Sequence, residues 1–160
     1  MAHIFESRNF DIQSEEYPLV DRNDGGHITI NPKVKISTRQ QLSAELAIEL
    51  MRLTIVVGEA MTIVMNMRGV DIERINYQDN GNWSVFKPEG PLLHIHLYGR
   101  ARSAIYQKYG QSLYFPHKDE NGDFYKNLSP LTNEDVLAMR EQIVVLFKRE
   151  KYSDEFWRLG

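Results

Sequence analysis

Apolar and polar side chains alternate along residues 91–100, which read P-L-L-H-I-H-L-Y-G-R. A period of two is typical of a β-strand, so the stretch is predicted to have one apolar face and one face that carries imidazoles. Successive residues on one face of a strand lie about 6.5 Å apart along the chain. The rings of His94 and His96 are therefore expected to contact one small anionic group together.

Further stretches are predicted to be strands. Residues 27–31 alternate in the same way, with His27 on the face opposite two isoleucines. Residues 72–78 are predicted to be another strand, and residues 17–20 a short one. Residues 1–16 are mixed in character and are predicted to form a short edge strand or an arm.

A long amphipathic helix is predicted between these strands. Thr38 and Gln41 fit a capping box, and the helix that follows is predicted to run to about residue 68, where Gly69 is suited to end it. One apolar stripe at helical spacing consists of Leu42, Leu46, Leu50, Leu53, Val57, Met61 and Val64. A second stripe consists of Ala47, Ile48, Met51, Ile55, Thr62 and Met65. Because such a helix must be covered on two sides, a homodimer is expected.

Residues 101–130 are rich in Tyr, Lys, Gln, Gly and Asp and are predicted to be an irregular excursion with little regular structure. Their aromatic and basic part, residues 102–118, is interpreted either as a solvated loop or as a lid over a substrate. A C-terminal helix is predicted over residues 131–150, with Thr132 as its N-cap.

Composition narrows the class of protein. The 160 residues are expected to form a single domain, with core 17–100, and 42% hydrophobic and 26% charged residues are ordinary for a globular protein. A net charge of −3 with both signs scattered does not indicate a general surface for nucleic acid. The absence of cysteine excludes disulfides and thiolate chemistry. No signal peptide and no run of about 18 apolar residues is visible, so no membrane contact and a cytoplasmic location are expected.

Two histidines on one strand face permit three kinds of chemistry. They can bind a metal, as in cupin barrels, but the residues after Tyr98 are cationic rather than acidic, and a long helix is foreign to an all-β barrel. They can act as general acid and base. They can also supply a neutral imidazole that attacks phosphorus. The cation Arg100 near an anionic substrate favours the second and third chemistries over the first.

At this point the sequence resembles a known family. L-L-H-I-H-L-Y-G-R is similar to the signature of the histidine-triad superfamily, in which three histidines alternate with apolar residues and are commonly followed by Pro-Arg. Residues 25–33, G-G-H-I-T-I-N-P-K, are similar to an earlier strand of that family. The resemblance covers residues 17–100 and implies an α+β fold with an antiparallel sheet of about five strands, one long helix and a C-terminal helix.

The resemblance permits two registers. If Gly99-Arg100 stands for Pro-Arg, then Leu92, His94 and His96 occupy the triad positions and His94 is the family's nucleophile. The alternative makes His94 the first histidine, His96 the nucleophile and Tyr98 the third residue. The first register is favoured because it places Arg100 correctly and gives both histidines direct chemical roles.

In the favoured register the resemblance implies that His94 attacks the α-phosphorus of a nucleotide, while His96 hydrogen-bonds a phosphoryl oxygen or the leaving group. His27 would support the site. Asp21 stands where the family carries an Asn or Asp that binds ribose hydroxyls, although it is interpreted equally well as a turn-forming residue.

Asn80 is a further candidate for substrate contact, alongside Arg100, although Asn-Gly is also simply a turn. Two features depart from the family pattern. Leucine replaces the first triad histidine at Leu92, and residues 87–91, K-P-E-G-P, replace a turn that commonly donates to phosphate. The loss of the first histidine is expected to impair orientation of the nucleophile more than to remove it.

The resemblance thus implies a homodimeric nucleotide hydrolase or nucleotidyl transferase. It would act without a cofactor or metal on dinucleoside polyphosphates or nucleoside phosphoramidates through a covalent histidine intermediate. The degraded triad keeps a second hypothesis open, in which the protein binds nucleotides with weak catalysis or none.

Overall fold

A computed structural model describes residues 1–117 and 119–160 of the protein. Its strands form one antiparallel sheet in the spatial order β1-β2-β3-β5-β4. The strands are β1 (Ala2–Glu6), β2 (Phe10–Ser14), β3 (His27–Pro32), β4 (Ile72–Gln78) and β5 (Ile95–Ala101). The predicted α+β class and the predicted sheet of about five antiparallel strands are confirmed.

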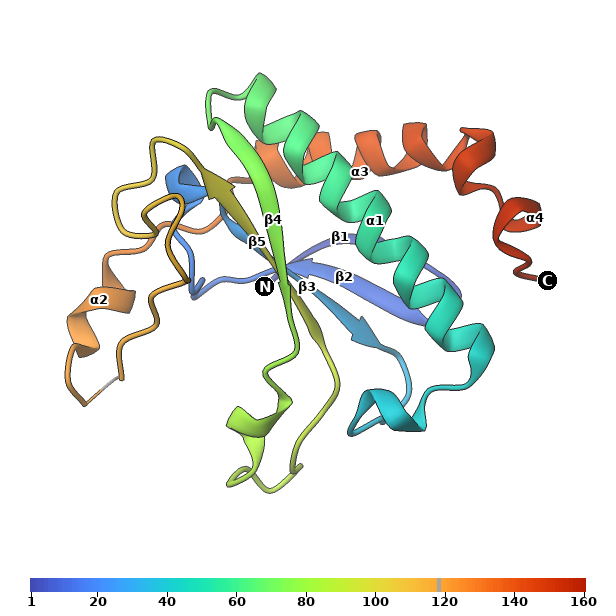
Figure 1. The fold of residues 1–160 in the computed structure, drawn as a ribbon, viewed down its shortest axis with the longest axis horizontal. Helices are drawn as coiled ribbons and strands as arrows, with labels where there is room; N and C mark the ends of the chain where they lie inside the picture. Colours follow the sequence, from blue (N-terminus) through green and yellow to red (C-terminus); the bar gives the residue numbers. More distant parts are fainter. Residues whose placement is uncertain (118) are drawn as a thin grey trace.

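The helices are α1 (Ala44–Met67), α2 (Gly122–Lys126), α3 (Asn133–Phe147) and α4 (Asp154–Trp157). In Figure 1, α1 runs diagonally across the sheet, α3 lies beyond it, and α2 stands apart on the excursion that follows β5. No described helix combines the length and the hydrophobicity that a bilayer crossing requires.

The two faces of the sheet differ in character. On one face, isoleucines and leucines of all five strands pack with α1 and α3 into one buried core, represented by Ile12, Ile28 and Leu97. On the other face, cross-strand pairing aligns His27 with Tyr98 and Thr29 with His96. The alternation along β3 and β5 thus keeps the imidazoles away from the core.

The two sequence motifs meet through glycines. The backbone of Gly25 passes so close to Gly99 that a Cβ on Gly25 would lie 2.3 Å from the carbonyl carbon of Gly99. Gly25 also has a φ of 132°, which disfavours any side chain there. The N–H of Gly99 donates to the carbonyl oxygen of Gly26 at 3.2 Å. The glycines therefore fix how the start of β3 lies against β5.

The start of the long helix was predicted too early. Thr38 precedes only a short 3₁₀ turn, where Gln41 Oε1 does accept from the N–H of Thr38 at 3.3 Å. Leu42 is extended, and α1 begins after Ser43, whose side chain accepts from the N–H of Leu46. The predicted end is confirmed by Gly69, which has a φ of 84°. Thr132 is the N-cap of α3, as predicted.

Two predictions about the N-terminal region were wrong or incomplete. Residues 17–20 are not a strand, and residues 1–16 hold the paired strands β1 and β2 rather than one edge strand or an arm. Pro18 lacks an N–H for a β-ladder, and the N–H of Leu19 bonds a side chain instead. The segment is therefore a connection between β2 and β3.

The second apolar stripe of α1 is covered only in part. Met65 is fully buried, while Met51 remains 56% exposed. The C-terminal residues Phe156 and Trp157 of α4 border a shallow hollow together with Met51. The tail thus supplies one part of the second cover that was expected from another subunit.

The excursion after β5 is irregular, as predicted. Asp24, just before β3, and Arg100 of β5 tie it to the sheet region, and Gln107 joins two parts of the excursion itself. Both carboxylate oxygens of Asp24 accept backbone N–H groups of residues 105–107, at 2.6–2.7 Å. Arg100 Nη2 donates to two carbonyls of the excursion, those of Lys108 and Gln111, at 3.0 and 2.8 Å. The buried amide of Gln107 bonds both backbone groups of Tyr114.

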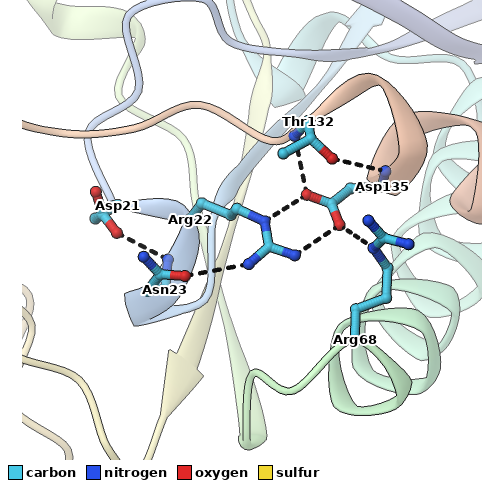
Figure 2. A network of polar contacts seen from close by, with 6 residues as sticks. All are labelled: Asp21, Arg22, Asn23, Arg68, Thr132 and Asp135. Atoms are coloured by element: carbon cyan, nitrogen blue, oxygen red, sulfur yellow. Dashed lines mark hydrogen bonds and ion pairs between the residues drawn. The ribbon is translucent and has the colours of Figure 1, made fainter.

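A second polar network holds the start of α3 (Figure 2). The carboxylate of Asp135 is fully buried and accepts Nε and Nη2 of Arg22, at 2.6 and 2.9 Å, as well as Nε of Arg68. It also accepts the N–H of Thr132 at 2.9 Å. One buried charge thus joins the β2–β3 connection, the end of α1 and the beginning of α3.

Candidate active site

A hollow of about 750 Å³ lies on the polar face of the sheet. Its wall contains His96 of β5, His94, which directly precedes β5, and His27 of β3. The rings of His94 and His96 are 4.5 Å apart between centroids and nearly perpendicular. The structure therefore brings three of the predicted site residues to one cavity.

Hydrogen bonds determine the tautomers of two of these imidazoles. The backbone N–H of Leu19 donates to Nδ1 of His27 at 3.2 Å, so the proton of neutral His27 is on Nε2. This Nε2 lies 2.8 Å from Nδ1 of His96 and donates to it. Neutral His96 therefore carries its own proton on Nε2. That nitrogen is buried and has no hydrogen-bond partner among the described residues, so it is a free donor.

The opposite tautomer is fixed at His94. Its Nδ1 lies 2.8 Å from the carbonyl oxygen of Leu92, which can only accept, so Nδ1 carries the proton. The lone pair of neutral His94 is then on Nε2. His94 is also more exposed than the other two imidazoles. The site thus combines one nucleophilic nitrogen with one buried N–H donor.

Burial keeps the two supporting histidines uncharged. It lowers the pKa of His96 from 6.5 to about 3, and the neighbouring His94 acts in the same direction. Burial, followed by the charges of His96 and His94, holds the pKa of His27 well below its usual 6.5. Both rings are therefore neutral near pH 7, so the tautomers derived from their hydrogen bonds apply there.

The buried ring of Tyr98 packs against both supporting histidines. Its ring is parallel to that of His96, at 5.5 Å and 7°, and tilted against His27 at 4.6 Å. Burial raises the pKa of Tyr98 above its usual 10, and its hydroxyl accepts a bond from Nδ2 of Asn80 at 3.3 Å. Asn80 therefore holds the tyrosine in place.

Three predicted substrate contacts, Asp21, Asn80 and Arg100, are not among the described residues that line the hollow. The carboxylate of Asp21 accepts the N–H groups of Asn23 and Ser129, at 2.8 and 2.7 Å, which is the turn-forming interpretation. Arg100 is directed to the excursion. In each case a family role was assigned to a side chain that has structural partners here.

Other residues of the site were not predicted from the sequence. The N–H of Leu19 sets the first tautomer, and no residue pattern reveals which backbone amide does so. Thr29 also lines the hollow and donates to Glu15 Oε1 at 2.8 Å. Thr29 had a usable signal, because it follows His27 by two residues on the same strand face.

A cluster of possible metal ligands and a further hollow lie elsewhere on the molecule. Among described residues, one group has three possible metal ligands within 4.8 Å: His3, Glu6 and Asp11. Lys33 Nζ lies 3.0 Å from Glu6, so a cation already neutralises that carboxylate. Another hollow of about 750 Å³ lies between α1 and the end of α3, lined partly by Arg52, and contains none of the predicted site residues.

No protein-family model matches the sequence, and no curated protein matches it. Solved structures do resemble the fold. A zinc-bound histidine triad family protein from Mycobacterium smegmatis is 17% identical, with a TM-score of 0.58 over 90% of this chain and 84% of that chain. A hypothetical histidine triad nucleotide-binding protein from Sulfolobus tokodaii is 17% identical, with a TM-score of 0.57 over 92% and 87%.

A histidine triad protein from Marinobacter aquaeolei VT8 is 18% identical, with a TM-score of 0.54 over 88% of this chain and 89% of that chain. These similarities extend well beyond residues 17–100, on which the resemblance in sequence rests. At this level of identity they concern the fold and not the chemistry. The protein therefore has the histidine-triad fold, as the sequence resemblance implied.

Proposed function

We propose that the protein is a nucleotide-binding enzyme that cleaves or transfers at the α-phosphate of a nucleotide, with His94 as nucleophile. The observation that carries the proposal is the pair of opposite tautomers. Nε2 of His94 presents a lone pair, and Nε2 of His96 presents a buried proton, on rings 4.5 Å apart. The names of solved structures with this fold include nucleotide-binding proteins, which supports the same ligand class.

The reaction proceeds in two steps. The lone pair of His94 Nε2 forms a bond to the α-phosphorus, and the bond to the leaving group breaks with its electron pair. The carbonyl of Leu92 stabilises the positive charge that develops on the imidazole through the Nδ1 proton. Water then attacks the phosphorus, and the nitrogen–phosphorus bond breaks to release a nucleoside monophosphate and neutral His94.

His96 stabilises charge during both steps. Its Nε2–H donates to a phosphoryl oxygen or to the leaving group as negative charge increases there. Because the donor is buried and has no partner in residues 1–117 and 119–160, it gives up no hydrogen bond to these residues when it engages the substrate. Lys35 and Lys87 at the exposed edge of the hollow attract the anionic substrate.

The test is product analysis with diadenosine tetraphosphate and adenosine phosphoramidate. Wild-type protein is expected to release AMP from at least one of them, and His94→Ala is expected to lower the rate at least about a hundredfold. His3→Ala is the matched control, because His3 is exposed and outside the hollow. Equal AMP release by wild type and His94→Ala contradicts the assignment of the nucleophile.

A second function has an observation in its favour. Leu92 supplies no imidazole, and residues 87–91 lack the donor turn of the family pattern. Under this hypothesis the protein binds nucleotides without turnover. Calorimetry that gives micromolar binding of AMP, together with no product from either substrate, selects this function over the enzyme.

We also propose that the protein is a homodimer. Its interface would consist of the free edge of β4 and the adjacent surface of α1. β4 is at the end of the sheet, and a hollow beside it is lined by Gly58 and Ile63 of α1 and by Ile75 and Tyr77 of β4. Tyr77 is 47% exposed there. An exposed edge strand next to a partly apolar helix is suited to pair with a second copy.

Light scattering during gel filtration tests the dimer. The wild-type protein is expected to have about twice the mass of the 18.7 kDa chain, and Tyr77→Glu is expected to shift it toward the monomer. Phe86→Glu, at an exposed position outside this hollow, is the control and is expected to leave the mass unchanged. A wild-type monomer at micromolar concentration contradicts the proposal.

A further inference from the structure

Tyr17 stands between two hollows. One is the cavity of the histidines, and the other has a volume of about 520 Å³. The side chain of Tyr17 belongs to the wall of both and is 83% exposed. An aromatic ring in this position can stack on a planar ligand that extends from one hollow into the other.

The position of Tyr17 is tied to the histidines. Leu19, two residues later, donates its N–H to Nδ1 of His27, and His27 in turn bonds His96. Pro18 between them is buried and restricts the backbone. The ring therefore protrudes from a connection that is fixed to the candidate active site, and a ligand that contacts His94 lies within reach of the same segment.

The second hollow is built by the excursion. Its described lining consists of Glu16, Tyr17, Gly122, Tyr125, Lys126 and Leu128. The hydroxyl of Tyr125 donates to the carbonyl oxygen of Pro116 at 2.8 Å, and its ring packs edge-on against Phe124 at 5.1 Å between centroids. Two tyrosine rings, one of them held in this way, provide an aromatic surface, while the charge of Lys126 in the same wall is paired with Asp123 at 2.8 Å.

This combination of groups selects a ligand class. Aromatic rings such as Tyr17 and Tyr125 stack on nucleobases. A phosphoramidate of a small amine has no group that extends from the histidines past Tyr17. A dinucleoside polyphosphate has a second base joined by a flexible anionic chain.

We propose that the second hollow binds the distal nucleoside of a dinucleoside polyphosphate and that Tyr17 stacks on its base. The inference rests on the proposed function, since it requires the α-phosphorus to lie at His94. It assigns to the excursion the selection of dinucleoside polyphosphates over nucleoside phosphoramidates. Glu16 in the same wall is suited to accept hydrogen bonds from the ribose hydroxyls.

Calorimetry with AMP and with a methylene-bridged, non-hydrolysable diadenosine tetraphosphate tests the proposal. The wild-type protein is expected to bind the dinucleotide about tenfold more tightly than AMP. Tyr17→Ala is expected to lose that advantage with unchanged affinity for AMP, whereas Tyr17→Phe retains it. Phe86→Ala is the matched control, since Phe86 is 98% exposed and lines neither hollow.

The outcomes separate this inference from the proposed function. Equal wild-type affinity for the two ligands overturns the second hollow as a binding site, even if His94-dependent turnover is observed. An equal loss of both affinities in Tyr17→Ala places the ring against the proximal base and also overturns it. Preferential binding of the dinucleotide that depends on Tyr17, without turnover, supports the inference and contradicts the enzyme. Equal unfolding midpoints of the variants show that folding is preserved.

Discussion

Backbone groups orient the imidazoles of the candidate site. The first triad position carries Leu92, which has no imidazole, yet its carbonyl oxygen accepts from Nδ1 of His94. The N–H of Leu19 plays the corresponding part for His27. Leucine at the first position therefore means the loss of an imidazole, but the backbone carbonyl that sets the tautomer of the nucleophile is still present. A nucleophilic His94 is thus compatible with an incomplete triad.

His27 is predicted to improve catalysis at the expense of stability in acid. Its Nε2–H fixes the proton of His96, so His27→Phe is expected to lower turnover about tenfold to a hundredfold. His27→Gln, whose amide can donate, is expected to recover part of this loss. Steady-state rates with diadenosine tetraphosphate measure both effects, and unchanged rates in His27→Phe contradict the relay.

The same residue gives a pH dependence with a definite sign. The pKa of His27 is lowered in the folded protein, so its neutral form is the one that folding favours. Above about pH 6.5 the histidine is neutral in both the folded and the unfolded protein, so it does not change the free energy of unfolding. Below that pH the unfolded chain binds a proton that the folded protein does not, and the free energy of unfolding falls. The free energy of unfolding is therefore expected to decrease as the pH is lowered from about 6.5 to 5.

Urea unfolding at pH 7.5 and pH 5 measures this loss. The fall in midpoint on acidification is expected to be smaller in His27→Phe than in the wild type, even if the variant is less stable at pH 7.5. The exposed His3 provides the control, and His3→Gln is expected to leave the fall unchanged. An identical fall in wild type and His27→Phe means that His27 is protonated in the folded protein.

At the scale of elements, the sequence pattern predicted the strands and the helix end that depend on residues close together in the chain. The alternation of side chains predicted β3 and β5, although β5 begins at Ile95, so residues 91–94 precede the strand and are not part of it as predicted. The strand β4 was predicted at its observed bounds, and Gly69 ended α1 because its positive φ suits a glycine. The start of α1 was misplaced because two capping signals lie five residues apart. Ser43 caps the helix, while Thr38 precedes a single turn.

A local sequence pattern could not predict contacts between segments that are distant in the chain. The excursion is positioned by Asp24, Arg100 and Gln107, whose partners are backbone groups of chain segments up to 83 residues away. The same limit applies to the site. His27, His94 and His96 were found because strand alternation puts them on one face. Asp21 was proposed by resemblance, and Arg100 by its charge and its place in the family pattern; here both bond backbone groups of other segments.

At the scale of the molecule, one buried charge joins three parts of the chain. Asp135 at the start of α3 accepts hydrogen bonds from Arg22 and Arg68 (Figure 2). None of these three residues lines the histidine hollow. Removal of one partner from a buried network leaves the others uncompensated. Asp135 is therefore expected to affect the stability of the fold without affecting the chemistry of the site.

Asp135→Asn is predicted to lower the free energy of unfolding by about 2 kcal/mol at pH 7. Burial alone would raise the pKa of Asp135, but the bonds from Arg22, the N–H of Thr132 and Arg68 outweigh it and lower the pKa to about 2. The carboxylate thus contributes its stability above about pH 4 and loses it as the pH falls toward 2. The deficit of the variant is expected to shrink over that range, because wild-type Asp135 then becomes neutral as well.

Asp123→Asn is the matched control, since Asp123 forms an ion pair with Lys126 in which both side chains are more than three-quarters exposed. Such pairs contribute little, so its unfolding midpoint in urea is expected to equal that of the wild type. Turnover by Asp135→Asn at a temperature where it is folded should also equal the wild-type rate. A variant with wild-type stability at pH 7 would mean that the two arginines and α3 are held by the apolar core alone. A stable variant with reduced turnover would instead connect this network to the histidines through β3, the strand that begins just after Arg22 and carries His27.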